Sequence, residues 1–364
     1  MADAYLSLER LDQLLELFPQ SNIAVVGDFF LDEYLVLDKS LTEISLETGL
    51  PAFQVTSCRK NPGVAGTVTN ILRSMEVPVT AIGFCGDDGH GFELRRCLLN
   101  QGINLQHFAI FEDRFTPTYT KPMLLENGSE TEQSRLDSKN RQPLPLDHEN
   151  QLIRSLRDVA ASLDVVLVID QARDRNCGVV TDAMRAEIAA LAARHPEKIF
   201  MADSRDHMSL FRNSIVKFNV NEASKMLEIA HPQPTPEFFT RLSYKLFHYY
   251  NKPILLTLGE QGMQVTDQAG SLIIPAIPIS GPTDIVGAGD SVMAAAGAAL
   301  SVGASTLEAA IIGNLTASLI IQQIGTTGLA TRQQIRQRFC ETRQWLNDSI
   351  RVMDNPSLLA EASA

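Results

Sequence analysis

The strongest chemical signal in the chain is a glycine-rich segment in its C-terminal third. Residues 281–290 have the sequence GPTDIVGAGD, and the helix-forming run SVMAAAGAAL follows. This order predicts that Gly287, Ala288 and Gly289 lie at a helix N-terminus, where free N–H groups and the helix dipole bind anions and glycine lets a phosphate approach the backbone. Asp290 falls in the first helical turn. A carboxylate there either complements the helix dipole or accepts a proton from an incoming hydroxyl.

Two further polar segments follow predicted strands. Asn219–Glu222 follows an apolar run; its carboxylate could hold Mg²⁺ through water, or the segment could cap a helix. Thr257–Gly262 (TLGEQG) follows another run and is either a turn between strands or a loop that contacts a nucleotide. Each segment alone has an ordinary structural explanation. Together, in this order along one chain, they favour a site that binds a phosphate and activates a hydroxyl.

The elements that must position these side chains alternate along the sequence. Apolar runs rich in Val and Ile predict buried strands, namely 23–26, 165–169, 198–202, 215–218 and 253–257. Helical spacing of apolar residues separates them, for example in 68–75 and 152–163. The alternation predicts a three-layer α/β domain with a mostly parallel central sheet. Active sites in such sheets lie at the carboxyl ends of the strands.

Two stretches interrupt this alternation. Residues 33–60 and 114–138 lack helical periodicity and are rich in Thr, Val, Tyr and Phe. We expect a small side sheet there, because the alternative, two long surface loops, is uncommon in compact domains. The remaining boundaries are an amphipathic helix within 1–20, one domain over 21–345 that ends in a helix at 331–345, and a tail over 346–364, frayed from 354.

Composition and charge restrict the class of protein. The 364 residues, 45% hydrophobic and 20% charged, suit a globular enzyme. The net charge of -12 argues against nucleic-acid or anionic-membrane partners, and no apolar stretch of about 18 residues predicts a membrane span. The N-terminus lacks the features of a signal peptide. The five cysteines form no CxxC pair, so a reduced, cytoplasmic setting is expected.

From about residue 22 to about residue 336, the chain resembles the ribokinase-like (PfkB) family of carbohydrate kinases. The resemblance rests on D-x-x-GAGD at Asp284–Asp290, N-x-x-E at Asn219–Glu222 and T-x-G at Thr257–Gly259. It also rests on VVGDFFLDEY near the start and on GFCGDDGHGFELRRCLLNQGI at Gly83–Ile103. It implies a ribokinase-like α/β/α domain with a small β-strand lid, and an ATP-dependent phosphotransferase that acts on an alcohol group of a sugar.

The resemblance also implies a role for each matching position. Asp290 would be the catalytic base, and the amides of Gly287, Ala288 and Gly289 the anion hole. The residues implied at ATP are Asn219, Glu222, Thr257, Gly259, Gly262 and Asn314, with Glu222 holding Mg²⁺ through water. The residues implied at the sugar are Asp28, Asp32, Gly63, Thr67, Arg135 and Arg205. Asp284 and residues 325–328 resemble the surroundings of the family's monovalent-cation (K⁺) site. In relatives the lid often forms a dimer interface, which implies a homodimer through residues 33–60 and 114–138.

Within the family, the chain is most similar to the D-glycero-β-D-manno-heptose-7-phosphate kinase branch, through GDFFLDEY, TPTYTK, RLD and GAGDSVMAA. It departs from that branch at the sugar: Val64 stands in place of a glycine, Thr67 in place of an asparagine and Leu46 in place of a proline. An arginine set could serve an anionic substrate or form surface ion pairs; it consists of Arg135, Arg173 and Arg205. The expected substrate is therefore a sugar or sugar phosphate, including a heptose 7-phosphate. The alternatives are a kinase of a nucleoside or another small alcohol, with Phe53 as the aromatic platform, and a catalytically silent binding protein.

Overall fold

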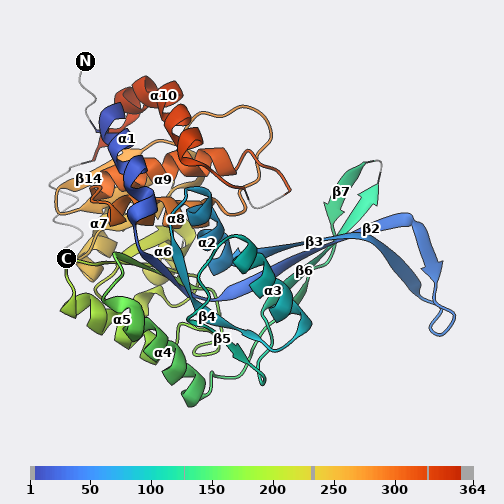
Figure 1. Cartoon of the computed structure of the whole chain (residues 1–364). Helices are drawn as coiled ribbons and strands as arrows, with labels where there is room; N and C mark the ends of the chain where they lie inside the picture. Colours follow the sequence, from blue (N-terminus) through green and yellow to red (C-terminus); the bar gives the residue numbers. More distant parts are fainter. Residues whose placement is uncertain (1–4, 127, 231–233, 326–327, 354–364) are drawn as a thin grey trace.

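A ten-stranded sheet forms the centre of the molecule, in the order β15-β14-β13-β12-β11-β10-β9-β1-β4-β5. The computed structural model describes residues 5–126, 128–230, 234–325 and 328–353 (Figure 1). Neighbouring strands from β5 to β12 are parallel, and β13 to β15 continue the sheet antiparallel. The strands are β1 (Ile23–Gly27), β4 (Val79–Gly86), β5 (Phe108–Phe111), β9 (Val165–Asp170), β10 (Ile199–Ser204), β11 (Ile215–Asn219), β12 (Ile254–Thr257), β13 (Met263–Asp267), β14 (Gly270–Ile274) and β15 (Arg351–Val352).

Helices cover both faces of this sheet, and each face has its own apolar core. Side chains buried on both faces explain why the parallel strands are mostly apolar runs rather than alternating patterns. One layer contains α1 (Leu8–Leu17), α2 (Ala65–Ser74), α3 (Gly89–Asn100), α8 (Ala288–Ser301), α9 (Thr306–Ile320) and α10 (Arg332–Ser349). The other contains α4 (Leu146–Ala160), α5 (Asp182–Arg194), α6 (Val220–Met226) and α7 (Pro236–Tyr250). The predicted three-layer α/β/α architecture is confirmed.

A second sheet projects from this body as an arm (Figure 1). Its order is β3-β2-β6-β7, and β8 also pairs with β6. The strands are β2 (Phe29–Ile44), β3 (Pro51–Val64), β6 (Thr118–Glu126), β7 (Ser129–Glu132) and β8 (Leu136–Ser138). The predicted side sheet is therefore confirmed, and the alternative of two long loops is wrong. Only Asp28 separates β1 from β2, so the lid continues directly from β1, an inner strand of the main sheet.

The C-terminal end of the described chain is more ordered than the sequence indicated. Helix α10 extends to Ser349, beyond the expected end at 345, because Leu346 and Ile350 continue its buried face at 3% and 8% exposure. Strand β15 then pairs with β14. The expected frayed segment 354–364 lies outside the described residues. Within the described ranges, no helix is both long and apolar enough to cross a membrane.

Candidate active site

A cavity of about 590 Å³ lies where the lid meets the carboxyl ends of β9, β10 and β11. This is the edge at which parallel α/β sheets bind their ligands. The main sheet and the adjoining helices contribute Ile169, Asp170, Gln171, Asp203, Arg205, Lys217, Asn219, Glu222, Ile285, Val286, Gly287, Gly289 and Asp290. The lid side contributes Asp32, Val64, Thr67, Tyr119, Lys121, Glu132 and Arg135. The predicted catalytic segment and several predicted sugar residues therefore face one space.

Asp290 lies in the first turn of α8, as predicted. Gly287 is the N-cap of that helix and has φ of 81°, a left-handed conformation that favours glycine. Burial and the negative charge of Asp203 raise the pKa of Asp290 to about 7, although the ammonium of Lys217 acts in the opposite direction. A carboxylate with this pKa is partly deprotonated near neutral pH and still basic enough to accept a proton from a hydroxyl.

Lys217 is a site residue that the sequence analysis missed. It is 4% exposed, and its ammonium donates a short hydrogen bond to Oδ2 of Asp203. A Cβ atom at position 289 would lie 3.2 Å from its Nζ, so the ammonium faces the glycine of the anion-binding turn. Burial alone would lower the pKa of Lys217, but Asp203, Glu222 and Asp290 outweigh that effect and raise it. The available signal was a lysine inside an otherwise apolar strand.

Asn219 and Glu222 have the helix-capping role that the sequence left as an alternative, and they also face the cavity. The Asn219 side chain accepts from the N–H of Glu222 at 2.9 Å, and the Glu222 carboxylate accepts from the N–H of Asn219 at 2.8 Å. Burial and the charge of Asp203 raise the pKa of Glu222. The capping box therefore holds the Glu222 carboxylate at the cavity wall.

The cavity wall has an excess of carboxyl groups that suits a bound cation. Six carboxyl side chains and four cationic ones line it, so a polyphosphate needs added positive charge to bind there. Mg²⁺ characteristically binds one or two carboxylates together with phosphates and water. Among the described residues, no group of three or more His, Cys, Asp or Glu side chains could hold a metal by itself. Glu222, with Asp203 beside it, fits an Mg²⁺ ion that arrives with a nucleotide.

The remaining residues predicted at ATP lie outside this cavity lining. Thr257–Gly262 forms the turn from β12 to the antiparallel β13, with Gly259 and Gly262 at φ of 62° and 97°. The amide of Asn314 donates to the carbonyl of Pro275 at 2.8 Å. Leu258 and Gln261, from the same turn, line a separate cavity of about 290 Å³. The nucleotide roles of Thr257, Gly259, Gly262 and Asn314 stay predictions.

Asp32 is the carboxylate best placed for a neutral hydroxyl. It is 8% exposed, and its Oδ2 lies 3.7 Å from the ammonium of Lys121. Its Oδ1 is buried and has no hydrogen-bond partner among the described residues. Gly63 lies against it: a Cβ atom at position 63 would be 2.9 Å from Cγ of Asp32. The glycine thus makes room for the Asp32 carboxylate, and both residues stay predicted sugar contacts, as do Thr67 and Arg135 on the same cavity wall.

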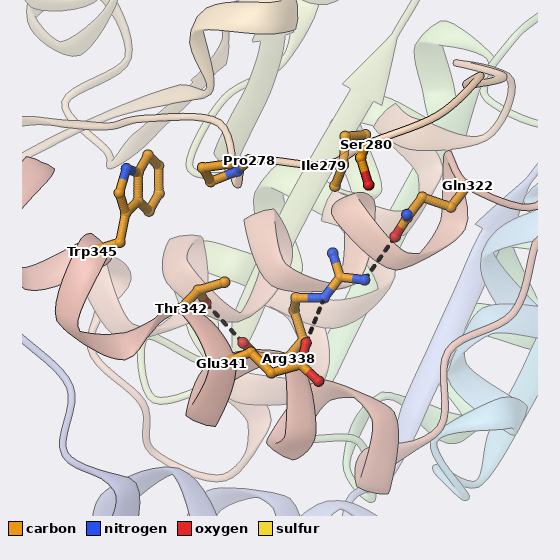
Figure 2. A pocket seen from close by; sticks show the side chains of 8 residues that line it. All are labelled: Pro278, Ile279, Ser280, Gln322, Arg338, Glu341, Thr342 and Trp345. Atoms are coloured by element: carbon orange, nitrogen blue, oxygen red, sulfur yellow. Dashed lines mark hydrogen bonds and ion pairs between the residues drawn. The ribbon is translucent and has the colours of Figure 1, made fainter.

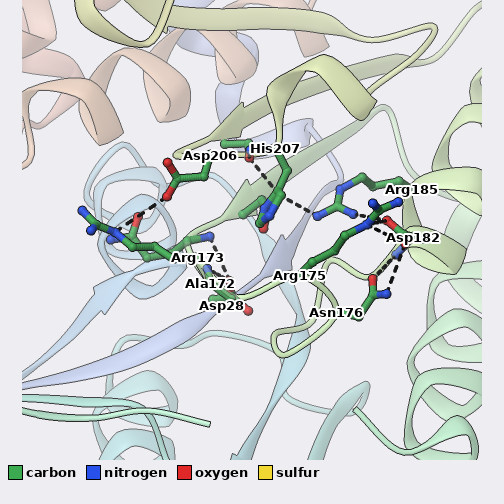
Figure 3. Close-up of polar contacts among 12 residues, drawn as sticks. Asp28, Ala172, Arg173, Arg175, Asn176, Asp182, Arg185, Asp206 and His207 are labelled. Atoms are coloured by element: carbon green, nitrogen blue, oxygen red, sulfur yellow. Dashed lines mark hydrogen bonds and ion pairs between the residues drawn. The ribbon is translucent and has the colours of Figure 1, made fainter. Parts of the chain in front are cut away.

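Asp28 is held differently. Its Oδ2 accepts from the N–H groups of Gln171 and Ala172, and its Oδ1 accepts from that of Val179, each at 2.8 Å (Figure 3). Burial and the charge of Asp170 raise the pKa of Asp28 to about 6. Asp28 therefore fixes the loop after β9, and its predicted contact with the sugar would have to coexist with these three bonds.

A second cavity, of about 260 Å³, adjoins the first and shares Tyr119, Gln171 and Arg205 with it. Its charged lining residues are Asp28, Lys139, Arg141, Arg173, Asp174 and Arg205. Cations therefore exceed carboxylates, the opposite of the first cavity. Arg173 is 3.7 Å from Asp206 (Figure 3), whereas Arg141 and Arg205 have no ion-pair partner in the described part of the chain.

Val64 and Asp284 lie at the edge of the site. Val64 has φ of 59°, an unfavourable conformation for a β-branched residue, at the place where the similar branch has glycine. Asp284 accepts from the N–H of Val286 at 3.0 Å, and its own N–H donates to the carbonyl of Ile321. The predicted monovalent-cation site also includes residues 326 and 327, which lie outside the described residues.

Comparison with known proteins places the chain among carbohydrate kinases. The model of the "pfkB family carbohydrate kinase" matches residues 21–332. The bifunctional protein HldE of Coxiella burnetii (strain Dugway 5J108-111) is 26% identical over 323 residues, which cover 85% of this chain and 62% of HldE. The HldE protein of Azorhizobium caulinodans is 27% identical over 317 residues, covering 86% of this chain and 63% of its own length. The chain thus spans less than two thirds of the length of these relatives.

Solved structures show the same fold at lower identity. Arabidopsis thaliana ribokinase complexed with ribose and ATP has a TM-score of 0.65 and 18% identity, covering 87% of this chain and 98% of the ribokinase. Phosphofructokinase-2 from Escherichia coli in complex with fructose-6-phosphate has a TM-score of 0.66 and 16% identity, covering 90% of this chain and 99% of that enzyme. The ribokinase-like fold with its β-strand lid is therefore established for this chain.

Proposed function

Because the chain belongs to the pfkB family of carbohydrate kinases, we propose that it transfers the γ-phosphoryl group of ATP to a hydroxyl of a sugar that already carries a phosphate. The family consists of phosphotransferases with alcohol acceptors. The observation that carries the proposal is the partly buried carboxylate of Asp290, with a pKa of about 7, beside the glycine turn of α8 in a cavity closed on one side by the lid.

In the proposed reaction, Asp290 accepts the proton of the acceptor hydroxyl while the hydroxyl oxygen attacks the γ-phosphorus. The bond between that phosphorus and the β,γ-bridging oxygen breaks, and ADP leaves. The free N–H groups at the start of α8 would stabilise the charge on the transferring group. The ammonium of Lys217, which faces Gly289, would add a second source of positive charge. Phosphoryl transfer depends mainly on such positioning and charge neutralisation.

Mg²⁺ would be held by Glu222 through water and would neutralise part of the nucleotide charge. The residues of this chain prepare that position: Asn219 fixes one oxygen of Glu222, and Asp203 is held by Lys217. Asp32, with one buried oxygen free of partners among the described residues, would accept a hydrogen bond from a second sugar hydroxyl. The lid strands that carry Asp32 and Tyr119 would exclude water from the reacting groups.

The basic second cavity supports a phosphorylated acceptor. Arg205 lines both cavities, and Arg141 lines the second one, without ion-pair partners in the described residues. A guanidinium binds phosphate through two parallel hydrogen bonds. A sugar with its hydroxyl at Asp290 would reach the second cavity with its phosphate. The similarity to HldE proteins and the resemblance to heptose-7-phosphate kinases make a heptose 7-phosphate the first acceptor to test.

The test is ADP release with matched pairs of neutral and phosphorylated sugars, including fructose with fructose 6-phosphate and a heptose with its 7-phosphate. The phosphorylated member should have a kcat/KM at least tenfold higher. Arg141→Ala should remove that preference without lowering the kcat/KM of the neutral sugar, because a charge-assisted hydrogen bond contributes about 1.5–3 kcal/mol. Arg96→Ala, on the exposed side of α3, is the control. A higher kcat/KM for neutral sugars would refute the phosphorylated acceptor.

The two alternative functions have less support. A nucleoside acceptor would need an aromatic platform, and Phe53 is 58% exposed on β3 and absent from the lining of the cavity. A silent binding protein would be expected to lack the base, the glycine turn or the Glu222 carboxylate, and all three are present. We further propose that the protein is a cytoplasmic homodimer formed through the lid. Exposed apolar side chains on its distal part support this; they are Leu41, Ile44, Leu50, Phe53 and Val55.

A further inference from the structure

Helix α10 brings residues from the end of the chain to the connection that leads into the glycine turn. The family model ends at residue 332, where α10 begins. A cavity of about 430 Å³ lies between this helix, the end of α9 and the connection from β14 to α8 (Figure 2). It is lined by Pro278, Ile279, Ser280, Gln322, Arg338, Glu341, Thr342 and Trp345. Half of this lining comes from beyond the family match.

Trp345 is the dominant side chain of this region. It is the single tryptophan of the chain, and it is partly buried against the apolar core. It lines the 430 Å³ cavity and also the separate 290 Å³ cavity that borders Leu258 and Gln261. Its indole N–H has no hydrogen-bond partner among the described residues. The indole therefore stands between two spaces, each next to a segment predicted to bind the nucleotide.

The backbone connects these spaces to the phosphate end of the proposed active site. Ser280 lines the 430 Å³ cavity, and seven residues later the same connection reaches Gly287 at the start of α8. Midway, the N–H of Asp284 donates to the carbonyl of Ile321 at 2.8 Å, and the next residue, Gln322, lines the cavity again. The same connection therefore borders the cavity beside Trp345 at one end and the proposed phosphate site at the other.

The charges of the cavity favour an uncharged ligand group. Arg338 is bound to Gln322 at 2.6 Å and to Ser318 at 3.2 Å, and it lies 3.6 Å from the carboxylate of Glu341 (Figure 2). Its charge is thus neutralised locally, which disfavours a free phosphate. An indole face with nearby hydroxyl and amide groups suits a flat, polar heterocycle, because stacking on an aromatic side chain accepts any base.

We propose that Trp345 is the stacking wall for the base of the nucleotide, so that α10 completes an ATP site that the family domain leaves open. The inference rests on the proposed function, since it assumes that ATP binds at the glycine turn. It assigns the base to the side of the molecule where Trp345 lies.

The single tryptophan provides a direct test in the unmodified protein. Titration with ATP and with adenosine should each change its fluorescence emission saturably, whereas inorganic tripolyphosphate should not. An equal response to tripolyphosphate, or no response to either nucleotide ligand, would overturn the inference. ADP release measured on the same sample separates the two proposals. Turnover without a change in emission defeats only the base site, whereas a change in emission without turnover on any acceptor defeats only the kinase.

Variants supply a second readout. Trp345→Leu keeps an apolar side chain but removes the stacking surface, and we expect the KM for ATP to rise about tenfold. Trp345→Phe retains a ring and should stay within about threefold of the wild type. At saturating ATP, the KM of the sugar should be unchanged in both. Gln344→Leu, on an exposed neighbouring position of α10, is the matched control. An unchanged KM for ATP in folded Trp345→Leu would contradict the assignment.

Discussion

Replacement of Asp290 by asparagine should lower the catalytic rate and, at alkaline pH, raise the stability of the protein. The change keeps the shape of the side chain and removes the base that we assign to the acceptor hydroxyl. General-base catalysis contributes about 10² to 10⁴ in rate, so kcat/KM should fall by at least about 100-fold. In the wild type, kcat/KM should rise with pH through about 7, where Asp290 loses its proton. That dependence should be absent from the residual activity of the variant.

The same substitution should stabilise the protein at alkaline pH. The pKa of Asp290 is raised from its ordinary 3.8 to about 7, so between these values the folded protein holds a proton that the unfolded chain has released. Stability therefore falls as pH rises through this interval. Each pKa unit corresponds to about 1.4 kcal/mol, which sets an upper limit of about 4 kcal/mol at pH 8, reduced by water in the cavity. The asparagine variant lacks this loss.

The assay combines ADP release from pH 6 to 9 with thermal unfolding at pH 5 and pH 8. The expected result is a Tm above that of the wild type, with a clearly larger gain at pH 8 than at pH 5, together with lost turnover. Asp267→Asn is the isosteric control, since Asp267 caps the turn between β13 and β14 and is absent from the cavity lining. Activity within threefold of wild type would refute the base role. Loss of activity without the gain in Tm at pH 8 would refute the burial argument.

Three further substitutions test the surroundings of Asp290. Lys217→Met removes a cation that lowers the pKa of Asp290, so the rise of kcat/KM with pH should move to higher pH. The kcat should also fall by about 10²-fold. A pH profile identical to that of the wild type would count against an interaction between the two charges. The same change leaves Asp203 without its partner and should cost about 3–5 kcal/mol of stability, which the double variant with Asp203→Leu should largely restore in chemical denaturation. Gly289→Val places a side chain where a Cβ atom would already be 3.2 Å from Nζ of Lys217, so kcat should fall at least tenfold while the protein stays folded by circular dichroism; a normal rate would exclude the anion-hole assignment. Val64→Gly relieves the positive φ of 59°, a strain of about 1–3 kcal/mol, but the greater conformational entropy of glycine in the unfolded chain opposes this gain. The free energy of unfolding should therefore change by no more than about 1 kcal/mol. Val26→Gly in the buried β1 should instead lose at least about 2 kcal/mol.

The sequence was sufficient for the architecture because local patterns and global fold agree along most of the chain. The Val and Ile run before Asp170 is typical of a strand buried on both faces of a parallel sheet, and β9 is buried throughout. The glycine turn and Asp290 were predictable for a similar reason, since a helix start is a local property of its own residues. The end of α10 was not, because Leu346 and Ile350 continue the helix by packing on the core rather than by local propensity.

The order of the elements, the family resemblance and the residues at the start of α8 were all predictable from the amino-acid sequence. The folded structure alone shows which distant side chains meet: Lys217 beside Asp203, Asp32 against Gly63, and Trp345 beside the connection to α8. Contacts of this kind, and the pKa of Asp290 that depends on them, arise from burial and charge between segments far apart in the chain. Local spacing contains no information about that burial or about which charges meet.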